Sequence, residues 1–158
     1  MVNQIEKADF AILVTGAARV ISDRLGDAVL RAGVDDMRSS FGFVIRALAE
    51  RERTLTELAE LLGVTKQAAI KVVDEMELGG YVEREADPND RRAKVIRLTP
   101  KARQVRRAAL AESRRVEAGL RRDLGVSDIE AMRRVLLRLL ERNGALDDAT
   151  AGRSKAIW

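Results

Sequence analysis

The 158-residue sequence contains no cysteine and no histidine. These two absences exclude a cysteine-based redox sensor, a structural zinc site, and the Ser-His or Cys-His pairs of nucleophilic catalysis. Acidic pairs occur at Asp35-Asp36 and Asp147-Asp148, but no base, nucleophile or phosphate-binding loop accompanies them. We therefore expect no catalytic residues, no metal site and no cofactor.

Aromatic residues make up only 3% of the chain, although hydrophobic residues reach 46%. The core must therefore consist of aliphatic side chains and alanine, which favours closely packed helices. No apolar run approaches the roughly 20 residues that a membrane-spanning helix needs. The first ten residues, MVNQIEKADF, are charged and lack the pattern of a signal peptide. We expect a cytoplasmic protein with no membrane partner.

The charge balance is mildly basic, with 29 Lys and Arg against 25 Asp and Glu and a formal net charge of +4. This excess permits a nucleic-acid or other anionic partner without requiring one. Sequence motifs are therefore needed to tell whether the partner is a nucleic acid.

The most informative segment begins at Thr54. Thr54 and Glu57 fit the capping box S/T-x-x-E at the start of a short helix that Gly63 ends. Thr65 is placed to cap a second helix, which runs to Leu78 and stops at two glycines. The pattern predicts two helices joined by a tight turn.

A hairpin is expected directly after these helices. Residues 81–85 and 94–98 contain β-branched side chains and flank the turn cluster Asp87-Pro88-Asn89-Asp90. Helix, turn, helix and hairpin in this order predict a winged helix-turn-helix, which presents one helix to the DNA major groove and a basic hairpin tip to the minor groove or backbone.

Further helical patterns flank this unit, one before it and two after it, and a capping box at Ser127 and Glu130 is expected to open the last helix. Their apolar faces need a partner, and a symmetric second copy is the economical one. The fold class predicted is mainly α with a small β-hairpin, a winged helix-turn-helix flanked by N- and C-terminal dimerisation helices. The predicted division is a helical dimerisation region at 1–33 and 101–144, a DNA-binding region at 34–100, and a flexible tail at 145–158.

The helix after Thr65 is the candidate for reading DNA, and its buried face is expected to hold Ala69, Val72, Val73 and Met76. Helix N-termini bind phosphate, glutamine suits adenine, and lysine suits guanine or phosphate. An exposed isoleucine either contacts a thymine methyl group or packs on the neighbouring helix. The candidate DNA contacts here are Thr65, Lys66, Gln67, Ile70 and Lys71. The alternative is an ordinary solvated surface helix.

The hairpin tip concentrates three cations, Arg91, Arg92 and Lys94. An arginine there can enter a narrow, electronegative minor groove. Asp90 is expected to orient the tip by pairing with Arg92. The alternative is a polar loop whose charges only keep it soluble.

Two other groups of residues are ambiguous. The basic run from Lys101 to Arg122 lies on the polar side of an amphipathic helix together with Glu112 and Glu117, so a solvated face with intrahelical or cross-dimer ion pairs is expected rather than a DNA surface. Met37, Phe41 and Phe43 are candidates for lining a ligand cleft, with core packing as the alternative.

At these residues the sequence resembles the MarR family of bacterial transcription regulators. The hairpin matches the family pattern D-x-R-x-x-x-x-x-L-T as Asp90, Arg92, Leu98 and Thr99, and ELAELLGVTKQAAIKVVDEMELGGYVER resembles the recognition-helix region. The resemblance spans roughly residues 7–142. One departure is Ala102, where the family commonly has glycine.

The resemblance implies a triangular homodimer that binds double-stranded DNA at a pseudo-palindromic operator. It also implies repression as the usual outcome, and release of DNA by a small aromatic or phenolic effector. The hypothesis from another class is a winged-helix protein–protein interaction module with only nonspecific DNA affinity. Such a module would bind DNA weakly and without sequence preference.

Overall fold

The computed structural model describes residues 9–86 and 94–145. Its elements are α2 (Phe10–Arg31), α3 (Ser39–Leu48), β1 (Arg53–Thr54), α4 (Leu55–Leu62), α5 (Lys66–Leu78), β2 (Val82–Ala86), β3 (Lys94–Leu98), α6 (Pro100–Leu124) and α7 (Val126–Arg142). The prediction of a mainly helical protein with a small hairpin is confirmed. Residues 1–8 of the predicted dimerisation region and residues 146–158 of the predicted flexible tail lie outside the described residues.

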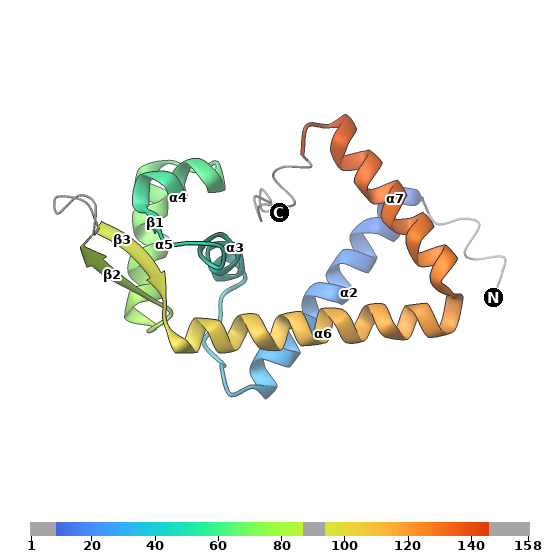
Figure 1. Cartoon of the computed structure of the whole chain (residues 1–158), viewed down its shortest axis with the longest axis horizontal. Coiled ribbons are helices and arrows are strands. Elements are labelled where there is room, and N and C mark those ends of the chain that lie inside the picture. Colours follow the sequence, from blue (N-terminus) through green and yellow to red (C-terminus); the bar gives the residue numbers. More distant parts are fainter. Residues whose placement is uncertain (1–8, 87–93, 146–158) are drawn as a thin grey trace.

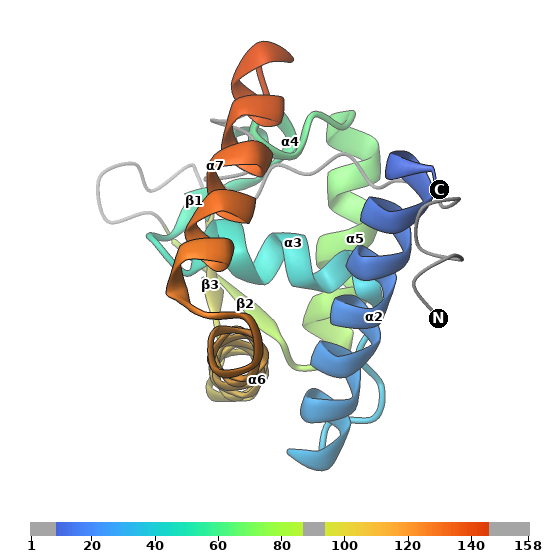
Figure 2. The same ribbon diagram turned by 90° about the vertical axis from the view of Figure 1, so that its right-hand side faces the viewer.

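The elements form two parts (Figure 1). We call α3, α4, α5 and the sheet the head, and α2, α6 and α7 the stem. The long helix α6 leads directly out of the head, α2 crosses it, and α7 starts at its far end (Figures 1 and 2). None of the helices in the described part of the chain is long and apolar enough to cross a membrane.

The sheet of the head has three antiparallel strands in the order β1-β3-β2. In the hairpin, Val82 pairs with Leu98 and Ala86 pairs with Lys94, as expected for strands joined by the predicted turn. The third strand, β1, pairs with β3 through only two residues. Two residues are too few to show an alternating pattern, so the sequence did not predict this strand.

The caps predicted at the two helices of the helix-turn-helix are present. Thr54 and Glu57 form the reciprocal capping box of α4, and Gly63 ends this helix in the left-handed conformation, at φ 64°. The Thr65 side chain accepts a hydrogen bond from the backbone of Ala68 and so caps α5. These local bonds fix where α5 begins, and therefore which of its residues lie in its first turn.

The core of the head is mainly aliphatic, as the composition predicted, with Phe41 and Tyr81 as aromatic members. Three of the four residues expected on the inner face of α5 are fully buried, and Val72 is half-buried against them. They pack with residues from α3, α4, the sheet and the first turns of α6, among them Val44, Leu58, Ile96, Ala102 and Val105. The start of α6 thus belongs to the core of the head.

The capping box expected at Ser127 and Glu130 is wrong. Helix α7 begins at Val126, its N-cap is Gly125 at φ 91°, and no side chain caps it. Ser127 therefore lies inside the first turn, and Glu130 pairs with Arg121 of α6 at 2.8 Å instead. The glycine turn between α6 and α7, rather than a capping side chain, sets the start of the helix.

The solvated face expected on α6 needs one correction as well. Arg121 and Glu117 form an intrahelical pair at 2.8 Å, as predicted. Glu112, however, is buried and receives hydrogen bonds from Arg24 of α2. The helix packs against α2 along this side, so a carboxylate assigned to the solvated face holds two helices together.

Candidate nucleic-acid interface

The helical period of α5 determines which of its residues are buried and which are exposed. Its inner face is fixed by Ala69, Val73 and Met76, which are no more than 1% exposed. The side chains predicted to contact DNA are all exposed: Thr65, Lys66, Gln67, Ile70 and Lys71. The structure therefore brings all five together at the N-terminal half of one helix.

Within the described residues, no carboxylate pairs with Lys66 or Lys71. Both ammonium groups are therefore available to an external anion, beside the N-terminal N–H groups of the helix. Ile70 is 38% exposed, so it does not pack fully on a neighbouring helix. This arrangement has the chemistry of a phosphate- and base-contacting surface.

The C-terminal half of α5 is acidic, and here the structure adds residues that the sequence analysis missed. Arg84 of β2 forms ion pairs with both Asp74 and Glu77. Arg38, just before α3, pairs with Glu75 at 2.7 Å. Three carboxylates that would repel DNA are therefore each matched by a guanidinium group.

No local signal reveals these pairs. Arg38 lies 37 residues from Glu75, and Arg84 lies 10 residues from Asp74. These pairs form because the segment before α3 and the hairpin pack near α5. The periodicity of the sequence does not predict that packing.

The hairpin follows α5 along the chain, and its strand β2 contacts α5. Lys94 is exposed at the first position of β3, paired with Ala86. Asp90, Arg91 and Arg92 lie outside the described residues, so their roles at the tip remain predictions. Arg97 of β3 pairs with residues on both sides of it. Its guanidinium lies 2.7 Å from Glu52, just before β1, and 2.9 Å from Glu85 in β2.

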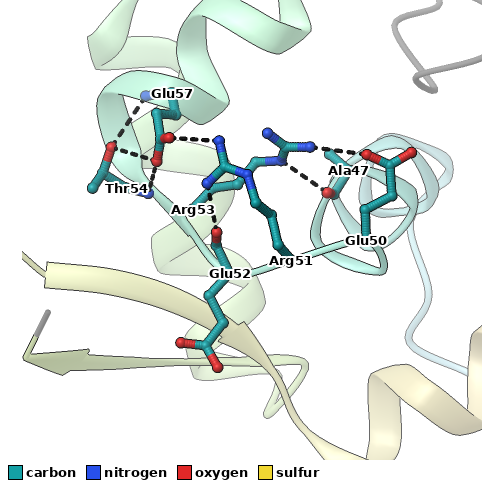
Figure 3. A network of polar contacts seen from close by, with 7 residues as sticks. All are labelled: Ala47, Glu50, Arg51, Glu52, Arg53, Thr54 and Glu57. Atoms are coloured by element: carbon teal, nitrogen blue, oxygen red, sulfur yellow. Dashed lines mark hydrogen bonds and ion pairs between the residues drawn. The ribbon is translucent and has the colours of Figure 1, made fainter. Parts of the chain in front are cut away.

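A second polar network supports the start of α4 (Figure 3). Glu57 accepts hydrogen bonds from the Thr54 backbone N–H at 2.7 Å and from Arg51 at 2.7 Å. The hydrogen bonds from Arg51 and Thr54 lower the pKa of the Glu57 carboxyl from its usual 4.5 to about 2. Nearby, Arg53 donates to the carbonyl of Ala47 at 3.0 Å (Figure 3) and so anchors β1 to the end of α3.

The three candidates for a ligand cleft have different environments. Phe41 is buried in the core, with its ring edge-on to Tyr81 at a centroid distance of 5.3 Å. Met37 and Phe43 are half-buried. Two hollows, of about 250 and 470 Å³, lie among the stem helices, and none of the three candidates lines them. The position of Phe41 agrees with the core-packing alternative.

The described residues include no group of three or more acidic side chains arranged to hold a metal ion.

Comparison with known proteins shows what this chain is similar to. Residues 43–93 match the family model described as "MarR family". The curated protein "Transcriptional activatory protein BadR" of Rhodopseudomonas palustris is 27% identical over 116 residues, which are 73% of this chain and 66% of that protein.

Solved structures share the fold. A MarR family protein from Bacillus stearothermophilus is 20% identical, with a TM-score of 0.67 over 90% of this chain and 95% of that one. The repressor CouR, bound to a 23-mer DNA duplex, is 24% identical, with a TM-score of 0.60 over 83% of this chain and 92% of that one. The matched head segment is similar to the MarR family, the curated relative is a transcriptional regulator, and the solved structures share the fold of this chain.

Proposed function

We propose that this protein is a dimeric, sequence-specific repressor that binds a pseudo-palindromic operator. Helix α5 enters the major groove, and the basic hairpin contacts the minor groove or the backbone. One observation carries the proposal: the first turns of α5 present Lys66, Gln67, Ile70 and Lys71 together on an exposed face. The acidic end of the same helix is matched by arginines.

Each side chain has a role in this proposal. Thr65 and Lys71 contact phosphates and set the register of the helix on DNA. Lys66 and Gln67 reach base edges, and Ile70 contacts a thymine methyl group. Arg91, Arg92 and Lys94 contribute the hairpin contact, with Asp90 orienting the tip. The DNA-bound CouR structure supports this mode of binding by a shared fold.

The exposed apolar face of the stem supports a homodimer. Phe10 of α2 is 61% exposed, and Val135 and Leu139 of α7 are 54% and 45% exposed. These three residues line one hollow of about 470 Å³. Apolar patches of this kind mark interaction sites, and a second copy supplies a self-complementary partner together with a second recognition helix.

Release by an effector is a further part of the proposal. Met37, half-buried against the core of the head, and Phe43, also half-buried, are the side chains we assign to a small aromatic or phenolic ligand. Such a ligand releases DNA only if it binds more tightly to a dimer whose recognition helices are wrongly spaced. Titrating the protein–DNA complex with a panel of phenols and aromatic acids tests this part directly.

Two measurements test the proposal as a whole. Light scattering should give twice the chain mass, and selection from a random DNA pool should recover two related half-sites in inverted orientation. Recovery of no consensus would favour the protein–protein module. A promoter–reporter fusion that carries the selected operator then determines the sign of regulation: repression is expected, although the relative BadR is named as an activatory protein.

A further inference from the structure

Two stretches of chain connect the stem to the head. Residues 32–38 lead from α2 into α3, and β3 continues through Thr99 into α6. The orientation of the head on the stem therefore depends on how firmly these two connections are held together.

Asp36 joins them. The Lys101 ammonium, in the first turn of α6, lies 3.0 and 2.9 Å from the two oxygens of Asp36. The Tyr81 hydroxyl, at the start of the hairpin, donates a hydrogen bond to the same carboxylate. Lys101 also donates to the carbonyl of Gly79, at the end of α5, at 2.9 Å. We call Asp36, Tyr81 and Lys101 the junction cluster.

The packing around Tyr81 holds its hydroxyl in place. The residue is fully buried, its ring packs edge-on against Phe41, and the Lys101 nitrogen lies 4.2 Å from the ring centre. A Cβ atom at Gly79 would come within 2.9 Å of the ring. The end of α5 and the phenol therefore fit together closely, and one does not move without the other.

The connecting segment is also held at both of its ends. Gln104 of α6 donates a hydrogen bond to the carbonyl of Ala32 at 2.7 Å. Arg38 pairs with Glu75 of α5. Residues 32–38 thus link the end of α2, the start of α6 and the recognition helix.

We infer that the junction cluster fixes the angle between the stem and α5, and thereby sets the operator half-site spacing that a dimer accepts. Helix α5 has 13 residues, so its first turn lies about 18 Å along the helix axis from its end at the junction. A small rotation at the junction is amplified at Lys66 and Gln67. The inference rests on the dimer of the proposed function, because only two recognition helices can define a spacing.

The absence of cysteine allows a direct test. In a Glu60→Cys chain, one nitroxide label on the exposed surface of α4 reports the distance between the two heads of a dimer by pulsed electron paramagnetic resonance. Tyr81→Phe removes only the hydroxyl and keeps the ring packing, whereas Lys101→Met removes the ammonium. The matched control is Arg51→Met, because Arg51 pairs with Glu57 inside the head at 2.7 Å.

We expect one narrow distance distribution for the labelled parent and for the Arg51→Met control, and at least a twofold broader one for Tyr81→Phe and Lys101→Met. Equal widths in the parent and the two junction variants would overturn the inference while leaving the DNA-binding proposal intact. Absence of any dipolar signal in the parent would refute the dimer, and the inference with it. A merely structural role would lower thermal stability without broadening the distances.

Operator variants give an independent readout. The unlabelled protein should bind the selected operator at least tenfold more tightly than duplexes in which one base pair is added or removed between the half-sites. The two junction variants should reduce this ratio at least threefold. Weaker binding by the same factor at every spacing would contradict the inference.

Discussion

Arg24 of α2 donates two hydrogen bonds to one oxygen of Glu112 in α6, from Nε at 3.0 Å and from Nη2 at 2.7 Å. The Glu112 side chain is only 4% exposed, and Arg115 lies 2.7 Å from its other oxygen. Hydrogen bonding from Arg24 and Arg115 holds the pKa of Glu112 below its usual 4.5. A buried carboxylate thus remains charged because guanidinium groups surround it, and it joins two helices of the stem.

Replacing this carboxylate should destabilise the protein. Glu112→Gln leaves the guanidinium groups without their counter-charge, and we expect the midpoint of thermal unfolding to fall by about 5 °C or more. Glu141→Gln is the control, because Glu141 pairs with Arg138 on an exposed face of α7 and should change the midpoint by about 1 °C or less. Equal effects of both substitutions would show that the α2–α6 contact does not depend on Glu112.

We expect the stability that Glu57 contributes at the start of α4 to depend on pH. Its pKa is about 2 in the folded state, against a usual 4.5, so the unfolded chain binds more protons between these values. Its contribution to the free energy of unfolding is therefore complete above pH 4.5 and is lost as the pH falls toward 2. In urea unfolding, the stability difference between the parent and Glu57→Gln should stay constant from pH 6 down to about pH 4.5 and then shrink as the pH falls to 3. A constant difference would contradict the hydrogen bonding in Figure 3.

Two glycines should respond in opposite directions to alanine. Gly42 lies in α3 with open space around it, so Gly42→Ala should raise the free energy of unfolding by about 0.5–1 kcal/mol through helix propensity. Gly63 ends α4 at φ 64°, also with open space. Gly63→Ala should therefore lower the free energy of unfolding by about 1–2 kcal/mol through backbone strain alone. Denaturant titration of both variants checks the sign of each change.

The local features of this fold were predictable from sequence, whereas its long-range contacts were not. The caps at Thr54 and Thr65 and the inner face of α5 depend on neighbouring residues, so spacing alone located them. The Ser127 pattern failed because Gly125 turns the chain before it and starts the helix two residues earlier than a Ser127 cap would. Tyr81 reaches Asp36 across 45 residues and Arg24 reaches Glu112 across 88. Periodicity carries no information on pairs at such separations.

In the candidate interface, too, the local features were predictable from sequence and the long-range contacts were not. The exposed residues of α5 follow from its helical period, so the sequence identified them as one face. The arginines that pair with its acidic end come from other elements, and only the folded arrangement reveals them.

Two substitutions on α5 should separate backbone contacts from base contacts. Lys71→Ala should weaken binding to all duplexes alike and reduce the slope of log affinity against log salt by about 1, as expected for one lost phosphate contact. Gln67→Ala should instead change the preference at one base pair by about 1–3 kcal/mol. Arg122→Ala, on the exposed side of α6, should leave both quantities unchanged. If Lys71→Ala changed the base preference, the assignment of Lys71 to a phosphate contact would be wrong.

The central claim is that α5 reads a DNA sequence, and fluorescence anisotropy across a salt series tests it most directly. The labelled duplex would be the selected operator or the DNA upstream of the protein's own gene, measured against a scrambled duplex of equal length and composition. The account predicts tight binding that persists at physiological salt in excess scrambled competitor. Equal affinity for the two duplexes, collapsing steeply as salt rises, would show that only charge is recognised and would contradict the account.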